Sequence, residues 1–335
     1  MENNKPIVEI KDLYVQFHSD DAIIHAVNGV DLTIREGETL GLVGETGAGK
    51  TTIARAILGI VAKPQGKITQ GEILFEGEDI LKLHEKDMRS LRGNQIAMIF
   101  QDPMTALNPI ERVGEQIEEA IGLHNEITHS DAIERAMQML ELVGIPRERY
   151  FEYPHQFSGG MKQRVVIAMA LACNPKLLLA DEPTTALDVT IQAQVLKMMR
   201  ELKEKLNTAV LMITHDLGVV ASICQKVAVI YAGEIVEYGT LEQIFDHPTH
   251  PYTLGLFGSL PKLDSTEKRL KPIRGMMPDP SVEIQGCKFA DRCEYATEEC
   301  LHTLPTLQPF SGTHQAACLR YADPDFHIKR GKRHG

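Results

Sequence analysis

Short apolar runs alternate with helical patterns along most of the chain. The runs at 40–43, 177–180 and 209–213 are almost wholly apolar, as expected of strands that are buried on both faces. A helical pattern follows the first run at residues 50–60, and from about 113 to 144 apolar residues recur at helical spacing. Buried strands that alternate with helices predict an α/β fold with a mainly parallel sheet.

The N-terminal part has a second pattern. Residues 7–17 alternate between apolar and polar side chains, and residues 71–76 read as another strand that stops at Gly77. Alternation is typical of strands with one buried face, so these segments predict a separate antiparallel piece.

Prolines become frequent after residue 256, which argues against long helices there. They include Pro261, Pro272, Pro278, Pro280, Pro305 and Pro309. We therefore predict two domains, 1–255 and 256–335.

Composition and charge narrow the function classes. The 335 residues are 43% hydrophobic and 24% charged, which indicates a globular protein. The net charge of −11 and the lack of Trp argue against nucleic acid as a partner. The longest apolar run, Val165–Cys173, is far shorter than the roughly 20 residues that span a bilayer. The N-terminus has no apolar signal segment, so we expect a cytoplasmic protein.

One glycine-rich segment carries specific chemistry. Residues 44–51, Gly-Glu-Thr-Gly-Ala-Gly-Lys-Thr, fit the phosphate-loop pattern G-x-x-x-x-G-K-[ST]. Glycines let backbone N–H groups turn toward phosphate oxygens, and the following helix presents its positive end to the anion. Lys50 then supplies a charge for the β- and γ-phosphates. The expected phosphate-binding residues are Gly44, Gly47, Ala48, Gly49, Lys50, Thr51 and Thr52.

A carboxylate pair completes such a site. The run at 177–180 ends in Asp181-Glu182. Asp181 is expected in the Mg²⁺ shell with the Thr51 hydroxyl, and Glu182 is the candidate that orients or deprotonates the attacking water.

Further segments resemble those of ATP-binding-cassette ATPases. Between the two motifs stands Ser158-Gly159-Gly160, with Gln163 shortly after it, which resembles the family signature. The Q-loop, D-loop and switch histidine of the family are similar to the surroundings of Gln101, Asp188 and His215. The resemblance covers roughly residues 7–255.

This resemblance implies a fold and a mechanism. The fold is a P-loop NTPase with a RecA-like α/β core, an antiparallel β subdomain and an α-helical signature subdomain at about 102–160. Gln101 would join the Mg²⁺ shell, His215 would act beside Glu182, and Phe17, with Tyr14 as the alternative, would stack on adenine. Two cassettes would dimerise head to tail, so that each signature completes the partner's ATP site.

Finer likeness points to importers of dipeptides and oligopeptides. It rests on residues 100–109, 181–190 and 250–253 and on the Cys-rich extension. The family implies a second, homologous ATPase, two transmembrane permease subunits and an extracytoplasmic solute-binding protein, with this chain peripheral on the cytoplasmic face of the membrane. The chain resembles the Cys-bearing ATPase of the pair. Related importers carry nickel, glutathione or oligosaccharides, so the solute stays open.

A non-transport cassette in repair or translation is the rival class. Repair ATPases of this type insert a long coiled coil between the two nucleotide motifs, and ribosomal ones usually hold two cassettes in one chain. This sequence has neither feature.

Four of the six cysteines fall in the last 50 residues. They are Cys287, Cys293, Cys300 and Cys318. In a reducing cytosol such a group favours a metal over disulfides. The spacing lacks the close pairs typical of structural zinc and matches neither ferredoxin pattern, so an iron–sulfur cluster, zinc and free thiols all stay open. The resemblance to the Cys-bearing importer subunits implies a [4Fe–4S] cluster and thus a small, irregular, metal-binding C-terminal extension.

Overall fold

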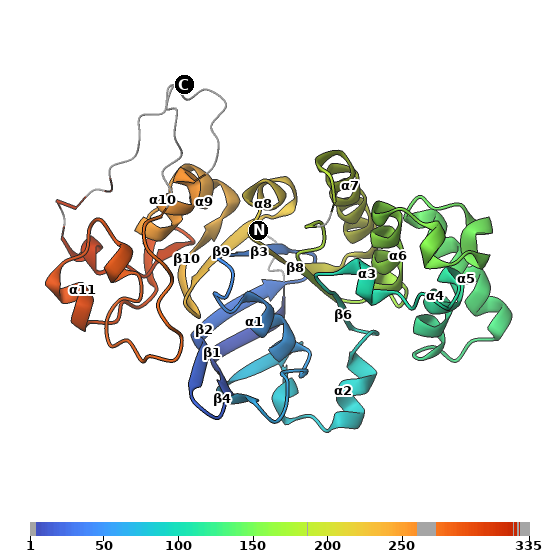
Figure 1. Cartoon of the computed structure of the whole chain (residues 1–335), viewed down its shortest axis with the longest axis horizontal. Helices are drawn as coiled ribbons and strands as arrows, with labels where there is room; N and C mark the ends of the chain where they lie inside the picture. The colour runs from blue at the N-terminus through green and yellow to red at the C-terminus, as the bar shows by residue number, and fades with distance from the viewer. Residues whose placement is uncertain (1–4, 186, 260–272, 324, 327, 329–335) are drawn as a thin grey trace.

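A computed structural model describes residues 5–185, 187–259, 273–323, 325–326 and 328. Figure 1 shows a central sheet with a smaller sheet below it and a group of helices to one side. The predicted boundary at residue 256 precedes the segment 260–272, which lies outside the described residues.

Within the described residues, the central sheet has eight strands in the order β11-β12-β10-β9-β3-β8-β7-β6. Its five neighbouring strands from β9 to β6 are parallel, and β10, β12 and β11 continue it antiparallel. The mainly parallel α/β core is thus confirmed. The strands are β3 (Thr39–Val43), β6 (Ile96–Ile99), β7 (Leu177–Asp181), β8 (Ala209–Thr214), β9 (Lys226–Tyr231), β10 (Glu234–Thr240), β11 (Gln308–Ser311) and β12 (His314–Ala316).

The second sheet is the predicted antiparallel piece, in the order β2-β1-β4-β5. It consists of β1 (Pro6–His18), β2 (Ile23–Arg35), β4 (Gly66–Phe75) and β5 (Glu78–Asp79). Strand β4 begins five residues before the predicted segment 71–76. Its first half is mostly exposed, so it has no apolar alternation that the sequence could reveal.

Helices surround the central sheet. They are α1 (Lys50–Ile57), α2 (Glu85–Leu91), α3 (Pro103–Ala106), α4 (Val113–Gly122), α5 (His129–Leu142), α6 (Gly159–Leu171), α7 (Val189–Leu206), α8 (Leu217–Ile223), α9 (Leu241–Asp246), α10 (Pro251–Gly258) and α11 (Glu298–His302). Short 3₁₀ turns are η1 (Ile80–Lys82), η2 (Arg147–Phe151), η3 (Pro154–Gln156), η4 (Ala290–Arg292) and η5 (Leu319–Ala322). Helix α1 ends before the predicted residue 60 because Gly59 adopts a left-handed φ of 62°. Within the described ranges, no helix combines the length and apolarity needed to cross a bilayer.

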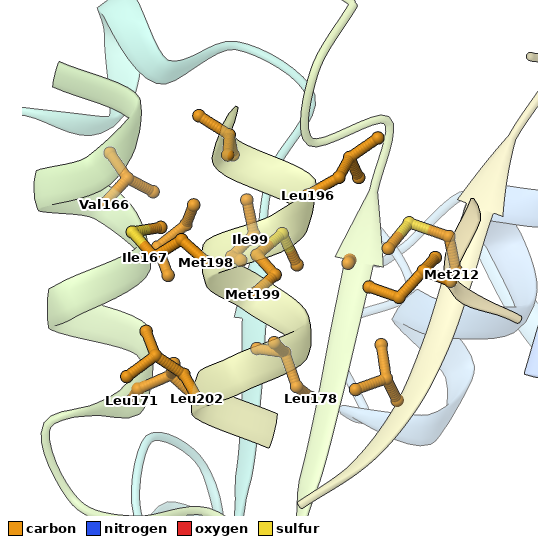
Figure 2. Packing of buried hydrophobic residues seen from close by; sticks show 14 of the residues in the cluster. Ile99, Val166, Ile167, Leu171, Leu178, Leu196, Met198, Met199, Leu202 and Met212 are labelled. Carbon is orange, nitrogen blue, oxygen red and sulfur yellow. The ribbon is translucent and has the colours of Figure 1, made fainter. Parts of the chain in front are cut away.

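The largest core lies between the helical group and the sheet. Figure 2 shows side chains of α6 and α7 meeting those of β6, β7 and β8. Leu171 of α6, Leu202 of α7 and Leu178 of β7 are each almost fully buried there. This packing fixes α6, and hence the segment before it, against the strands that carry Asp181 and Glu182.

The C-terminal segment continues the central sheet. Strand β12 pairs with β10, and Figure 1 shows the segment beside β10. A buried polar cluster joins the two: Glu237 of β10 accepts hydrogen bonds from His314 (2.7 Å), from the Thr249 backbone N–H (2.7 Å) and hydroxyl (2.6 Å), and from the His250 backbone N–H (2.9 Å). All four residues are at most 2% exposed.

We expect His250 to make this region sensitive to acid. Burial lowers its pKa from 6.5 to about 4, although Glu237 opposes the shift. The unfolded chain therefore binds the proton first as the pH falls below 6.5, so stability declines with falling pH. Between pH 7.5 and 5.5 we expect this residue to cost about 1 kcal/mol of unfolding free energy. His250→Asn, which keeps an acceptor for the Tyr252 backbone N–H, should reduce the pH dependence by that amount in urea titrations.

The exposed His84→Asn variant is the control for losing any one histidine. Equal pH dependence in the wild type and His250→Asn would contradict this assignment.

Candidate functional site

The phosphate loop joins β3 to α1, and two of its glycines, Gly44 and Gly49, leave no room for a side chain. A Cβ on Gly44 would lie 2.2 Å from the Ile230 carbonyl oxygen, and one on Gly49 would lie 2.4 Å from that of Ala26. Gly47 and Gly49 also have positive φ angles of 84° and 101°. The loop therefore wraps tightly over the N-terminus of α1, where backbone N–H groups face an anion.

Lys50 lies inside this loop. Its Nζ donates to the carbonyl oxygens of Gly44 (2.8 Å) and Glu45 (2.9 Å), and the residue is only 6% exposed. Burial lowers the pKa of Lys50, while the carboxylates of Glu182, Asp181 and Glu45 act in the opposite direction. A polyphosphate at the loop would add further negative charge beside this buried ammonium.

Asp181 meets the start of α1. The Thr51 hydroxyl donates to both of its carboxylate oxygens, at 2.8 and 3.1 Å. Burial raises the pKa of Asp181, and the Thr51 hydrogen bond opposes it. The two residues meet because β3 and β7 both flank β8 and end at the same edge of the sheet. A hydroxyl and a carboxylate at a phosphate loop are typical ligands of Mg²⁺.

Three side chains converge on Glu182. Gln101 Nε2 donates to it at 2.9 Å, the Thr185 hydroxyl at 3.0 Å, and His215 Nδ1 lies 2.9 Å from its Oε1. Burial by itself would raise the pKa of Glu182, but the partners, His215 first, outweigh it and hold the pKa below its ordinary value. Glu182 also has a left-handed φ of 48°, which is uncommon for a non-glycine residue.

The structure thus brings together Gln101, Glu182 and His215, which follow the neighbouring strands β6, β7 and β8. Thr185 was not among the predicted site residues. Its position three residues after Glu182 is the only signal in the sequence, and many turns share that spacing.

The signature residues lie on a different part of the chain. Ser158 is the N-cap of α6, and its hydroxyl accepts from the Met161 backbone N–H at 3.4 Å. Helix α6 packs against α3, α4, α5, α7 and β6, whereas α1 packs against β2 and β7. A Cβ on Gly160 would lie 2.5 Å from Ile191 at the start of α7, whose N-cap is Asp188. The positive end of α6 is therefore separate from that of α1.

Gln163 is 1% exposed, and its amide atoms have no hydrogen-bond partner among the described residues. It lies one turn into α6, within the signature helix.

Two aromatic residues were the predicted alternatives for stacking on the adenine ring of ATP. Phe17 stands opposite Gly66 of β4, where a Cβ would approach its ring to 2.9 Å, and it is partly buried. Tyr14 packs over Gly29 of β2, where a Cβ would lie 2.9 Å from its hydroxyl. Phe17 and Tyr14 both stay predictions.

The four C-terminal cysteines line one cavity of about 20 Å³ together with His250 and Arg320. Burial raises the pKa of the Cys287 thiol to about 12 and that of Cys318 to about 11, and every pair among the four thiols is close enough to interact electrostatically. The four cysteines thus lie around one cavity.

The metal site predicted at these cysteines is not confirmed. In the described part of the chain, no three or more His, Cys, Asp or Glu side chains are arranged closely enough to hold a metal ion. The cavity has room for about one water molecule. The donor chemistry, four thiols at one place, still suits zinc or an iron–sulfur cluster.

A contact from this segment to the phosphate loop had no sequence signal. Arg292, between Cys287 and Cys293, pairs with Glu45 at 2.8 Å across 247 residues.

Comparisons with known proteins agree with this geometry. Residues 27–185 match the ABC transporter family, and residues 236–300 match the C-terminal region of oligopeptide/dipeptide transporters. The chain is 48% identical over 317 residues to a probable peptide ABC transporter ATP-binding protein of Sinorhizobium fredii, covering 94% of this chain and 95% of that one. It is 49% identical over 308 residues to the oligopeptide transport ATP-binding protein OppD of Haemophilus influenzae, covering 91% and 94%.

A solved structure is similar as well. It is the dimeric, post-hydrolysis form of the ATP-binding cassette MJ0796 bound to ADP and phosphate. The TM-score is 0.63 at 28% identity, covering 70% of this chain and 98% of that one.

Proposed function

Because this chain belongs to the family of ABC transporter ATP-binding subunits, we propose that its phosphate-loop site powers uptake of dipeptides or oligopeptides through a membrane importer. One observation carries the proposal: Thr51–Asp181 and the three partners of Glu182 assemble at one edge of the sheet, beside the phosphate loop. The oligopeptide/dipeptide match at 236–300 supports the solute class.

Each residue has a role in this proposal. The loop 44–52 holds the ATP phosphates, and Lys50 contacts the β- and γ-phosphates. Thr51, Asp181 and Gln101 would hold Mg²⁺, directly or through its shell. Glu182, whose partners hold its pKa below the ordinary value, accepts a proton from the attacking water, while His215 holds the Glu182 carboxylate in place.

The signature would act in trans. The start of α6 lies apart from the phosphate loop of the same chain, so Ser158, Gly159 and Gly160 are available to a second subunit. Gln163, which we assign to the same signature, is buried behind them in α6. The solved relative is dimeric. We propose a heterodimer with a homologous ATPase in the transporter, with a homodimer as the form in isolation. ATP would join the positive ends of α1 and of the partner's α6, and hydrolysis would release them.

The remaining partners are membrane subunits. The helical region at about 102–160 would dock a membrane subunit, one of two transmembrane permease subunits in the importer. This contact would place the chain on the cytoplasmic face of the membrane, with an extracytoplasmic solute-binding protein acting indirectly. In this proposal the cassette spans 1–255 and the extension 256–335. Nickel, glutathione and oligosaccharides are the alternative solutes.

The function is tested by reconstitution. With the partner ATPase and two membrane subunits in liposomes, a solute-binding protein loaded with a dipeptide or tetrapeptide should stimulate ATP hydrolysis several-fold over the unloaded protein. Stimulation by nickel, glutathione or an oligosaccharide instead would redirect the solute class. Co-purification with ribosomes or DNA in place of membrane subunits would contradict a transport role.

We further propose that the four C-terminal thiols hold a [4Fe–4S] cluster, with Zn²⁺ as the alternative, as in the Cys-bearing subunit of such a pair. The support is their convergence on one cavity. A bound cluster would cross-link Cys287, Cys293, Cys300 and Cys318 through sulfur–metal bonds. The described part of the extension offers short elements only, so such a link would stabilise its fold.

Metal content separates the alternatives. Protein purified without oxygen should contain about four iron and four acid-labile sulfide per chain. Cys300→Ser should lose most of the iron, whereas Cys173→Ser, outside the cavity, should keep it. A colourless preparation with stoichiometric zinc would contradict the iron–sulfur cluster, and one without metal would contradict both.

A further inference from the structure

The Cys-rich segment reaches directly into the phosphate loop. The Arg292 guanidinium binds the Glu45 carboxylate with two parallel hydrogen bonds, Nη1–Oε2 at 2.8 Å and Nη2–Oε1 at 3.1 Å. The Arg292 side chain is only 7% exposed and that of Glu45 28%. A bidentate pair with so little water around it is stronger than an exposed ion pair.

Arg292 is itself held in place. Its Nε donates to the Arg274 carbonyl oxygen at 2.9 Å, and Nη1 also reaches the Tyr231 hydroxyl at 3.2 Å. The guanidinium carbon lies 5.7 Å from the centre of the Tyr231 ring and 6.0 Å from that of Phe289. These contacts fix the guanidinium relative to the segment Cys287–Cys293, since Arg292 directly precedes Cys293.

Glu45 is fixed on its other sides. Its backbone N–H donates to the Tyr252 hydroxyl at 2.9 Å, and its carbonyl oxygen accepts from Lys50 Nζ at 2.9 Å. The Glu45 carboxylate is also near enough to act electrostatically on Lys50. Arg292 thus forms an ion pair with the Glu45 carboxylate, which lies beside the phosphate-binding loop.

A second cation from the same segment supports the loop indirectly. Lys288 donates to the Ala232 carbonyl oxygen at 3.0 Å and pairs with Glu234 at 3.0 Å. The adjoining Gly233 N–H donates to the Ala48 carbonyl oxygen at 3.0 Å. Lys288 and Arg292 both lie in the segment between Cys287 and Cys293. This segment therefore supports the phosphate loop at two points, directly through Arg292 and indirectly through Lys288.

We propose that Arg292 is a positioning residue of the phosphate loop: it holds the Glu45 carboxylate away from Lys50 and the nucleotide phosphates, so that ATP affinity depends on the folded Cys287–Cys293 segment. Without Arg292, the carboxylate would compete with ATP for Lys50 and repel its phosphates. The proposal holds for any metal, or none, at the thiols. It rests on the proposed phosphate-binding role of residues 44–52.

The test is the affinity of the full-length protein for a fluorescent ATP, N-methylanthraniloyl-ATP, with Mg²⁺. We expect Arg292→Met to raise the Kd about tenfold, because an unpaired charge remains next to the phosphates. Glu45→Gln removes that charge, so the double variant Arg292→Met/Glu45→Gln should return to within about threefold of the wild type. This rescue distinguishes positioning of Glu45 from general support of the fold.

An ion pair at the opposite end of β3 and β9 provides a matched control. Lys226 pairs with Glu38 at 2.8 Å where β9 and β3 begin, and the side chains are 23% and 8% exposed. Lys226→Met should leave the Kd within about twofold. An equal rise in Lys226→Met and Arg292→Met, or no rescue by Glu45→Gln, would overturn the proposal.

Two further variants keep the outcome clear. If Arg292→Met does not fold, as judged by circular dichroism, Arg292→Gln with and without Glu45→Gln gives the same comparison, because the glutamine amide carries no charge to offset the carboxylate. Lys50→Met tests the phosphate-loop assignment separately by abolishing binding. Loss of binding in Lys50→Met with unchanged Kd in the Arg292 variants would reject only the positioning role.

Discussion

Replacing Glu182 with Gln should lower ATP hydrolysis by about 10²- to 10⁴-fold while ATP still binds. An amide cannot accept the proton of the attacking water, yet it has nearly the same volume. Its oxygen can still accept a hydrogen bond from Gln101 or Thr185, so the local structure should persist. The contact with His215 loses its charge, which would add to the loss of rate.

The measurement requires the assembled transporter, because the proposed site is completed by the partner's signature. Nucleotide binding is followed in parallel by filter retention of labelled ATP. Glu201→Gln, on the exposed side of α7, is the matched control and should hydrolyse ATP at the wild-type rate. Hydrolysis near the wild-type rate in Glu182→Gln would reject Glu182 as the base.

Replacing Glu237 with Ala should destabilise the protein by about 3–5 kcal/mol. The carboxylate is fully buried and accepts from His314, from Thr249 and from the backbone N–H of His250. Truncation would leave these donors buried without an acceptor and open a cavity. Because His314 belongs to β12, the C-terminal segment should be released first.

Thermal unfolding and limited proteolysis measure this effect. Glu237→Ala should show a lower melting temperature and earlier cleavage within 273–323 than the wild type. Glu242→Ala, exposed on the neighbouring helix α9, should differ from the wild type by less than about 0.5 kcal/mol. Equal cleavage in the two variants would show that the cluster does not hold the segment.

The sequence was most informative where a function depends on contiguous residues. The loop 44–51 and the pair Asp181-Glu182 could be predicted because each is one unbroken pattern next to an apolar run. The convergence of Gln101 and His215 on Glu182 depends on the lateral order of three strands, which periodicity does not encode; the family resemblance supplied their roles.

The remaining features depend on contacts between distant segments. Arg292 and Glu45 are both ordinary charged residues in the sequence, and only the docking of the C-terminal segment makes them partners. The first half of β4 carries mostly exposed side chains, so its pairing with β1 left no hydrophobic signal. The four C-terminal cysteines line one small cavity, but among the described residues no three metal-ligating side chains lie close enough together to hold a metal ion.

The addition of β12 and β11 to the central sheet bears on how this protein can be shortened. Strand β10 pairs with β9 on one side and with β12 on the other, and β12 is followed by β11 at the margin. A cassette cut at residue 255 would leave backbone groups of β10 at Glu237 and Tyr238 without their present partners. Open strand edges of this kind recruit other strands, so the trimmed cassette would tend to self-associate. The extension therefore also pairs the exposed edge of β10, so that strands of other molecules cannot add to the sheet there.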